Sequence, residues 1–292
     1  MRDIFLNKNL MKDYFSITKP GIIGGNAITV VAGFLLASGG DVDWWLLLAT
    51  LVGLSLVVAG GCVINNYIDR DIDGMMERTK DRALVIGTIT PRIALIYGKV
   101  LAIFGLGVLA FYTNLLTTAM AVLGLFVYVV VYSLWLKRTS THGTIVGSIS
   151  GAMPPVVGYL AVSGSIDLGA VILFFILALW QMPHSFAIAI YRLEDYTKAG
   201  IPVLPVKRGI AITKIHMLIY TALFVMATFA LAVFGYTGYE YLLVMVILGL
   251  GWLGLSASGF YSTNNKFWSR NMFVYSIAIL VVFSIMIAIE GF

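Results

Sequence analysis

The residues best suited to chemistry lie in one polar stretch, which interrupts a chain that is otherwise almost wholly apolar. Within it Asn65, Asp69 and Asp73 recur every four residues, and we call these three residues the polar ladder. On a helix this spacing puts an amide and two carboxylates on one face. Carboxylates so close repel each other by ~1 kcal/mol or more, so a cation is expected between them. Hard oxygen ligands with vacant positions suit Mg²⁺, which usually takes its remaining ligands from a substrate phosphate.

Basic residues follow the polar ladder. Arg78, Lys80 and Arg82 suit a phosphate leaving group, although the excess of positive charge on the cytoplasmic side of membrane proteins explains each of them equally well. Asp71 points to the other face of the helix, where a pair with Arg70 or Arg78 is as good an interpretation as a metal ligand.

Composition excludes a soluble globular protein. Of the 292 residues, 60% are hydrophobic and 11% are charged, and the mean hydropathy is +0.95, whereas a soluble domain has an apolar share of about 45–50%. The sequence therefore predicts an all-α polytopic membrane protein. Apolar runs close to the ~20 residues that a bilayer requires predict nine transmembrane helices, at 21–38, 44–64, 92–112, 114–136, 144–163, 169–190, 213–234, 239–260 and 271–290.

The connections divide this single predicted domain, residues 1–292, into functional parts. Residues 1–20 mix lysines with apolar side chains, which is typical of an interfacial amphipathic helix, and Lys19 is expected to anchor at the lipid headgroups. The long polar connections 65–91 and 191–213 are expected to be cytoplasmic catalytic loops.

The distribution of Lys and Arg predicts the orientation. Connections that follow odd-numbered runs contain no Lys or Arg, whereas the N-terminal segment and the other connections contain nearly all of them. The N-terminus is therefore expected in the cytoplasm and the C-terminus outside. The net charge of +5 follows from this topology and from phosphate chemistry, so nucleic acid is not an expected partner. The single Cys62 excludes an intramolecular disulfide framework.

The connection 191–213 contains a second group of charged residues. Asp195, with Glu194, could form a second metal or phosphate site. A pair with Arg192 or Lys198 would explain both acids equally simply.

Two further places could contribute to a site. Lys137 and Arg138 form a short basic turn. His184 lies in an apolar run, where a hydrogen-bonded structural histidine is nearly as good an interpretation as a role in the site.

These stretches together make a family recognisable. The segment Asn65–Asp73 with Met76–Lys80 resembles the first aspartate-rich motif of the UbiA-type intramembrane prenyltransferase superfamily. Further stretches resemble its protohaem IX farnesyltransferase branch, namely Leu136–Arg138 with Gly151–Pro155, Trp180–His184, and Asp195–Tyr196 with Ala199–Pro202. The similarity covers almost the full chain, and the combination is highly specific, although the first motif alone would fix only the superfamily.

The resemblance implies a nine-helix bundle in the inner membrane, around a central cavity open toward the cytoplasmic side. It implies farnesyl diphosphate and protohaem IX as substrates and Mg²⁺ as cofactor. In that family a farnesyl group is joined to a haem vinyl group and water is added, which gives haem O for terminal oxidases or as the haem A precursor. Haem A synthase and a terminal oxidase are thus candidate protein partners.

The resemblance also implies roles for individual residues. Catalysis and metal binding are expected of Asn65, Asp69, Asp73 and Asp195. Substrate binding is expected of Arg78, Lys80, Arg82, Lys137, Arg138, His184, Arg192 and Lys198, the first three on diphosphate and the others on haem.

One departure from the superfamily pattern concerns the second loop. There the wider superfamily has acids one helical turn apart, whereas Arg192 and Tyr196 stand in those places around Asp195. A symmetrical clamp of two motifs and two metals is therefore in doubt.

Two other functions stay open from the sequence. The same site could prenylate a quinone precursor or another aromatic ring, although the Trp180–His184 stretch and the Pro154-Pro155 helix favour haem. The chain could instead be a cation or metabolite transporter, because acids at membrane depth also mark ion pathways. The clustering of the acids at one rim favours an enzyme site open on one side.

Overall fold

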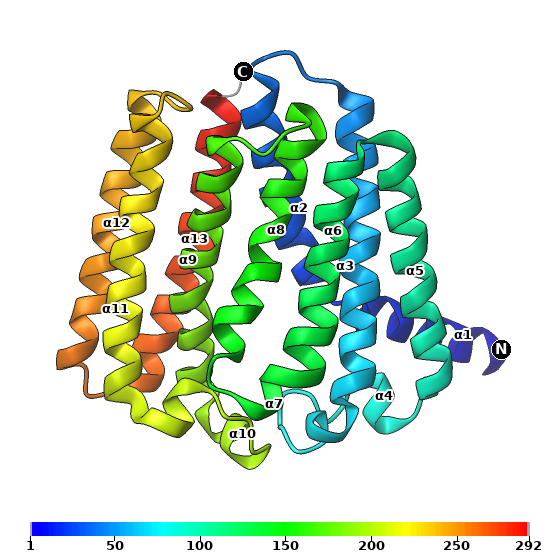
Figure 1. Cartoon of the computed structure of the whole chain (residues 1–292). Coiled ribbons are helices and arrows are strands. Elements are labelled where there is room, and N and C mark those ends of the chain that lie inside the picture. Colours follow the sequence, from blue (N-terminus) through cyan, green and yellow to red (C-terminus); the bar gives the residue numbers. More distant parts are fainter. Residues whose placement is uncertain (1, 291–292) are drawn as a thin grey trace.

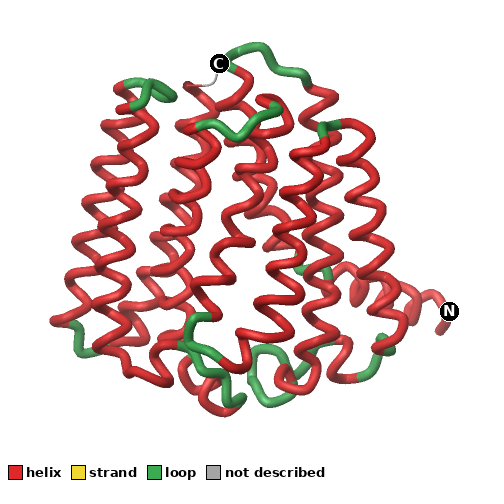
Figure 2. The backbone as a smooth tube through the Cα atoms, viewed as in Figure 1, coloured by secondary structure: helices red, strands yellow, loops and turns green. Residues whose placement is uncertain are grey.

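The computed structural model describes residues 2–290, in which every regular element is a helix (Figure 2). Nine spans in this range are long and apolar enough to cross a membrane, which confirms the predicted fold class. They are α2 (Pro20–Ser38), α3 (Trp44–Asp73), α5 (Pro91–Tyr112), the continuous α6 (Leu115–Phe126), η1 (Val127–Leu136) and α7 (Lys137–Thr139), α8 (Gly143–Ser163), α9 (Leu168–Tyr191), α11 (Leu204–Val233), α12 (Tyr239–Ser258) with η2 (Gly259–Tyr261), and α13 (Asn265–Glu290).

Three short elements gather at the end of the bundle that is drawn at the bottom of Figure 1, namely α4 (Ala83–Ile86), α7 and α10 (Leu193–Lys198). The helix α1 (Arg2–Ile17) lies beside the lower half of α5. In α1 the ring of Tyr14 packs edge-on against Tyr97 of α5, with 5.3 Å between centroids, while Leu10, Met11 and Phe15 are exposed. An amphipathic helix at a membrane interface has this division of side chains.

Two helices extend into segments that were expected to be catalytic loops. The helix α3 has 30 residues and continues to Asp73, so its last turns belong to what the sequence analysis took for a loop. A 30-residue helix is about 45 Å long, which exceeds the roughly 30 Å of hydrocarbon. The helix α11 begins at Leu204 and is broken only at Gly209, whose φ is 82°. The segment 191–213 is therefore also largely helical.

Glycines hold α3 tightly against α5. A Cβ atom at Gly60 would lie 2.6 Å from the carbonyl oxygen of Gly98, and one at Gly105 would lie 2.6 Å from the carbonyl oxygen of Gly53. Because the backbones touch directly, only glycine fits at these positions. The helix that carries the polar ladder is thus fixed along its length.

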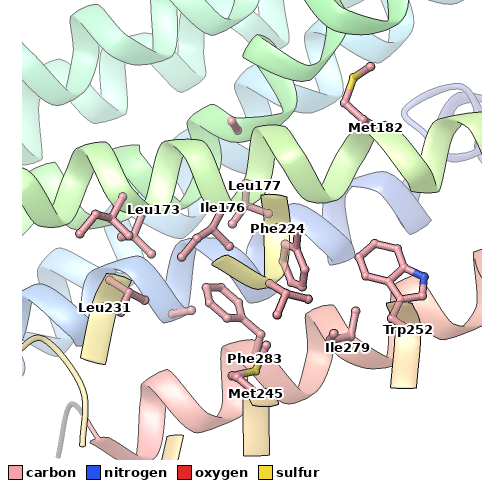
Figure 3. Close-up of a cluster of buried hydrophobic side chains, with 14 of the residues drawn as sticks. Leu173, Ile176, Leu177, Met182, Phe224, Leu231, Met245, Trp252, Ile279 and Phe283 are labelled. Carbon is pink, nitrogen blue, oxygen red and sulfur yellow. The ribbon is translucent and has the colours of Figure 1, made fainter. Parts of the chain in front are cut away.

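The last third of the chain packs against α9. The largest hydrophobic cluster joins α11, α12 and α13 to α9, and it extends to α2 and α8 (Figure 3). Phe224 and Trp252 are fully buried there and pack edge to face, with 5.3 Å between ring centroids. This packing supports α9 from behind.

The contact between α3 and α5 predicts a stability difference between two glycines of the same helix. Gly105→Ala should lower the free energy of unfolding by about 1–3 kcal/mol, because the new methyl group meets the backbone of Gly53. Gly107→Ala is the control, since a Cβ atom there meets nothing within 4 Å. Thermal unfolding of both purified variants in detergent measures the difference, and equal melting temperatures would contradict the close contact.

Candidate active site

A cavity of about 400 Å³ lies among α2, α3, α6, η1, α8 and α9. Its walls include apolar side chains such as Leu54, Val57, Leu125 and Met153, and charged side chains from the end of α3 and the connection after it. The polar part lies at the end of the bundle where the short elements gather (Figure 1). The cavity therefore has a charged mouth and an apolar interior.

The polar ladder lines this mouth. Asn65, Asp69 and Asp73 are only 3%, 1% and 2% exposed, and all three face the cavity. Because α3 is helical to its end, the spacing of four residues keeps them on one face. The Asn65 Nδ2 atom donates to Asp69 Oδ2 at 2.8 Å and to Ser133 Oγ at 3.0 Å, which orients the amide.

Each buried carboxylate has a cationic partner from another segment. Lys137 pairs with Asp69 Oδ2, and Arg82 pairs with Asp73 Oδ2 at 2.5 Å. The second oxygen of Asp69 is buried and accepts no hydrogen bond from the described residues, and Arg138 Nη2 lies 3.8 Å from it. One carboxylate oxygen at the mouth is thus left without a strong partner.

A π-helical segment, η1, forms the opposite wall. Tyr128 and Tyr132 of η1 stack with 6.1 Å between centroids and line the cavity, as does Lys137 directly after the segment. The wider turn of a π-helix changes which residues share a face, and such segments are frequent at functional sites. The sequence analysis predicted an ordinary helix here and did not point to Tyr128.

Lys19 is a site residue that the sequence analysis missed. It was expected at the lipid headgroups, but its Nζ atom donates to Asn65 Oδ1 at 2.6 Å and it lines the cavity. Its backbone is left-handed (φ 57°), a strained conformation for a lysine, and this residue precedes α2. Burial lowers the pKa of Lys19 to about 8.

The other predicted basic residues divide into two groups. Arg78 and Arg82 line the cavity, whereas Lys80 is exposed and pairs with Glu77 at 2.5 Å. Arg138 lies outside the lining and binds Asp71 with two hydrogen bonds of 2.7 Å. The partner of Asp71 is therefore Arg138, and not the predicted Arg70 or Arg78.

Asp195 contacts the connection after α3 and does not join the polar ladder. Its Oδ1 atom accepts the backbone N–H of Glu77 at 3.1 Å. Within residues 2–290 no three His, Cys, Asp or Glu side chains gather to hold a metal by themselves.

Tyr196 does line the cavity, and burial raises the pKa of its hydroxyl, which therefore stays protonated. The neighbouring Lys198 is exposed.

His184 faces α13 and is not among the residues that line the cavity. Its ring stacks on Trp180 with 4.6 Å between centroids, and its Nδ1 atom lies 2.7 Å from Ser276 Oγ. These contacts favour the interpretation of His184 as a structural, hydrogen-bonded histidine.

From the same helix Gln181 lines the cavity, and its buried Oε1 atom has no partner among the described residues. A Cβ atom at Gly151 would lie 2.0 Å from that oxygen, so glycine there makes room for the amide.

Comparison with known proteins decides the family. The family model described as the UbiA prenyltransferase family matches residues 26–277. The chain belongs to the UbiA prenyltransferase family. A protoheme IX farnesyltransferase of Yersinia pseudotuberculosis serotype O:1b is 53% identical over 281 residues, which cover 96% of this chain and 95% of the relative. Protoheme IX farnesyltransferase 2 of Pseudomonas aeruginosa is 56% identical over 280 residues, with the same coverage. The resemblance drawn from the motifs is confirmed.

Solved structures share the fold of this chain. A digeranylgeranylglyceryl phosphate synthase has a TM-score of 0.80 at 20% identity and covers 97% of this chain and 99% of that one. A UbiA homolog from Archaeoglobus fulgidus, bound to GPP and Mg²⁺, has a TM-score of 0.63 at 15% identity and covers 94% of this chain and 99% of that one. The chain is a multi-span membrane prenyltransferase, and the transporter alternative is set aside.

The buried pair of Lys137 and Asp69 predicts a double-mutant effect on stability. Lys137→Met should lower the free energy of unfolding by about 3 kcal/mol, because it leaves the buried carboxylate of Asp69 without its cation. This value is at the low end for breaking a buried pair, since Asn65 and Arg138 remain near that carboxylate. Adding Asp69→Asn should restore most of this loss. Lys80→Met is the control, since its pair with Glu77 is exposed. Additive losses in the double variant would contradict the pair.

Proposed function

We propose that this chain transfers the farnesyl group of farnesyl diphosphate to a vinyl group of protohaem IX, with addition of water, to give haem O. The observation that carries the proposal is identity of 53–56% over 96% of the chain with proteins named as protoheme IX farnesyltransferases. A mass spectrum of haem extracted after incubation of the purified protein with protohaem, farnesyl diphosphate and Mg²⁺ tests it. Recovery of unmodified protohaem alone would refute it. The same relatives favour haem over a quinone precursor as acceptor.

Magnesium fits the residues at the mouth. Asn65, Asp69 and Asp73 offer oxygen atoms on one helix face, and the buried Asp69 Oδ1 atom lacks a hydrogen-bond donor among the described residues. Two carboxylates and one amide are too few to complete an octahedral shell, which suits an ion that shares its ligands with a diphosphate. When bound, magnesium would neutralise part of the charge of the diphosphate leaving group. The Archaeoglobus homolog bound to GPP and Mg²⁺ supports this assignment.

The chain's own cations stabilise the departing diphosphate. Cleavage of an allylic carbon–oxygen bond leaves negative charge on the diphosphate oxygens, and fixed cations lower the energy of that charge more than flexible solvent does. Lys19, Arg78, Arg82 and Lys137 all line the mouth. The hydroxyl of Tyr196 can donate a hydrogen bond at the same end. We assign these five side chains to diphosphate binding.

The apolar interior suits the farnesyl chain. Leu54, Val57 and Leu125 provide apolar lining that excludes water, and Tyr128 and Tyr132 line the same cavity. An allylic cation is attracted to an aromatic face by about 1–2 kcal/mol. The carbon atom that loses the diphosphate would therefore be shielded from premature attack by water.

Residues outside the mouth take other roles in the proposal. Asp195 positions the connection that contains Arg78 and Arg82 through its contact with Glu77, and is not itself a metal ligand. The connections that contain nearly all Lys and Arg residues lie at the end of the bundle that bears the mouth. In the inner membrane this end therefore faces the cytoplasm. The described residues act as one enzyme domain.

Two conservative substitutions separate a metal ligand from a positioning residue. Asp73→Asn should reduce haem O formation by about 10²-fold or more, because the amide lacks the charge that binds a cation. Asp195→Asn should leave most of the activity, since an amide oxygen still accepts the Glu77 N–H. Haem O is quantified at saturating farnesyl diphosphate over a range of Mg²⁺ concentrations. Equal losses in both variants would contradict this division of roles.

Lys19 predicts a pH dependence. Its pKa of about 8 is lowered by burial, so its ammonium is charged below that pH and becomes neutral as the pH rises through it. The value of kcat/KM for farnesyl diphosphate should therefore fall above pH 8, since that ratio reports the ionisation of the free enzyme. Lys19→Arg should remove this decline, because arginine stays charged. A decline of the same midpoint in that variant would exclude Lys19 as its source.

A further inference from the structure

A second cavity, of about 350 Å³, lies on another face of α9. From α9 the first cavity is lined by Gln181, Ser185 and Ala189, whereas the second is lined by Ile188 and Tyr191 and by Arg192 directly after the helix. Arg270, Phe273 and Val274 of α13 form its other side, and Arg78 completes it. We call it the arginine cavity. Arg78 lines both cavities, so they meet at this residue.

The three guanidinium groups of the arginine cavity have no carboxylate partner. In the described part of the chain, Arg78, Arg192 and Arg270 form no ion pair within 4.0 Å. Four other basic residues of this end of the bundle do have one: Arg82 with Asp73, Lys80 with Glu77, Lys137 with Asp69, and Arg138 with Asp71. The arginine cavity is thus a concentration of free guanidinium groups, which bind carboxylates with two parallel hydrogen bonds.

The rest of the lining is aromatic and aliphatic. The Arg192 guanidinium lies 4.8 Å from the centroid of the Tyr191 ring. Phe273 lines the cavity and packs against His184, with 5.0 Å between ring centroids, and His184 stacks in turn on Trp180. A ligand that fits must therefore combine a flat apolar body with more than one acidic group. Inorganic phosphate has no such body.

We propose that the arginine cavity binds the propionate-bearing edge of protohaem, an assignment that rests on the proposed function. Protohaem is a planar aromatic dicarboxylate, and its two propionates match the surplus of guanidinium groups. Its vinyl-bearing edge is opposite its propionate-bearing edge. Carboxylates held by Arg192 and Arg270 therefore direct the vinyl groups past Arg78 toward the first cavity, where the farnesyl group is released.

The arginines assigned here to the propionates are not the full set of haem-binding residues that the sequence analysis expected. Lys137 and Arg138 are paired with Asp69 and Asp71, whereas Arg192 and Arg270 have no carboxylate partner among the described residues. Of the predicted haem-binding cations, Arg192 lines the arginine cavity. Arg270 was not identified from the sequence. Its nearest charged residue in the chain is Lys266, and nothing in the sequence connects Arg270 with Arg78 or Arg192.

The test removes charge from either the protein or the ligand. The full chain is reconstituted in nanodiscs of zwitterionic lipid, so that anionic headgroups do not compete, and binding of protohaem and of its dimethyl ester is followed by the Soret absorption. Arg192→Ala and Arg270→Ala should each raise the Kd for protohaem about tenfold or more, the effect of losing a charge-assisted hydrogen bond. The Kd for the ester should be the same in wild type and variants. Arg270→Lys should give an intermediate value.

An exposed arginine elsewhere at this end provides the matched control. Arg208→Ala removes the same charge from a residue that lines neither cavity, and should change no Kd. The KM for farnesyl diphosphate should stay within twofold in the Arg192 and Arg270 variants.

Two results would overturn the assignment. In the first, both variants raise the Kd for protohaem and the Kd for its dimethyl ester by the same factor, which would mean that the propionate charge is not what the cavity recognises. In the second, both variants bind protohaem as wild type does, so that the propionates lie elsewhere. Because binding is measured without farnesyl diphosphate, either result is independent of whether haem O is formed, and a failure of the proposed function is seen separately in the mass spectrum.

Discussion

The buried charge of Asp69 and Asp73 is the constraint on which the site depends. Removing a carboxylate from water costs several kcal/mol unless a cation and hydrogen bonds compensate. The compensating groups come from distant parts of the chain: Lys137 follows η1, and Arg82 follows the turn after α3. A third cation, Lys19, binds Asn65 just before α2. Two carboxylates and one amide on the same helix thus hold three separate segments at the mouth of the cavity.

This arrangement requires a helix that does not move relative to its neighbours. The backbone contacts of α3 with α5 at Gly53, Gly60, Gly98 and Gly105 supply that rigidity. Behind α9, the cluster around Phe224 and Trp252 fixes the helix that separates the two cavities. The hydrophobic packing and the charged site therefore depend on each other: packing alone leaves the carboxylates uncompensated, and ion pairs alone do not align the helices.

Much of this could be predicted from the sequence, and the rest could not for identifiable reasons. Nine spans follow from apolar length, and the face shared by Asn65, Asp69 and Asp73 follows from a spacing of four. The role of Lys19 was hidden, because a lysine before a proline at the start of a span looks like a headgroup anchor. The π-helical winding of η1 has no signal in its apolar sequence, so Tyr128 was missed. Long-range pairs such as Asp71 with Arg138 depend on tertiary packing that spacing does not encode.

The charge balance at the mouth explains why the site suits a polyanion even before a metal is considered. Four cations line the mouth, Lys19, Arg78, Arg82 and Lys137, and two carboxylates oppose them, so the difference, four minus two, leaves two positive charges. This surplus lies in a partly enclosed cavity, where screening by salt is weaker than at an open surface. Because the opposite end of the cavity is apolar, a molecule with a charged head and a hydrocarbon tail can enter in only one orientation. The same residues that stabilise the buried carboxylates therefore also determine which end of a prenyl diphosphate lies beside the acceptor.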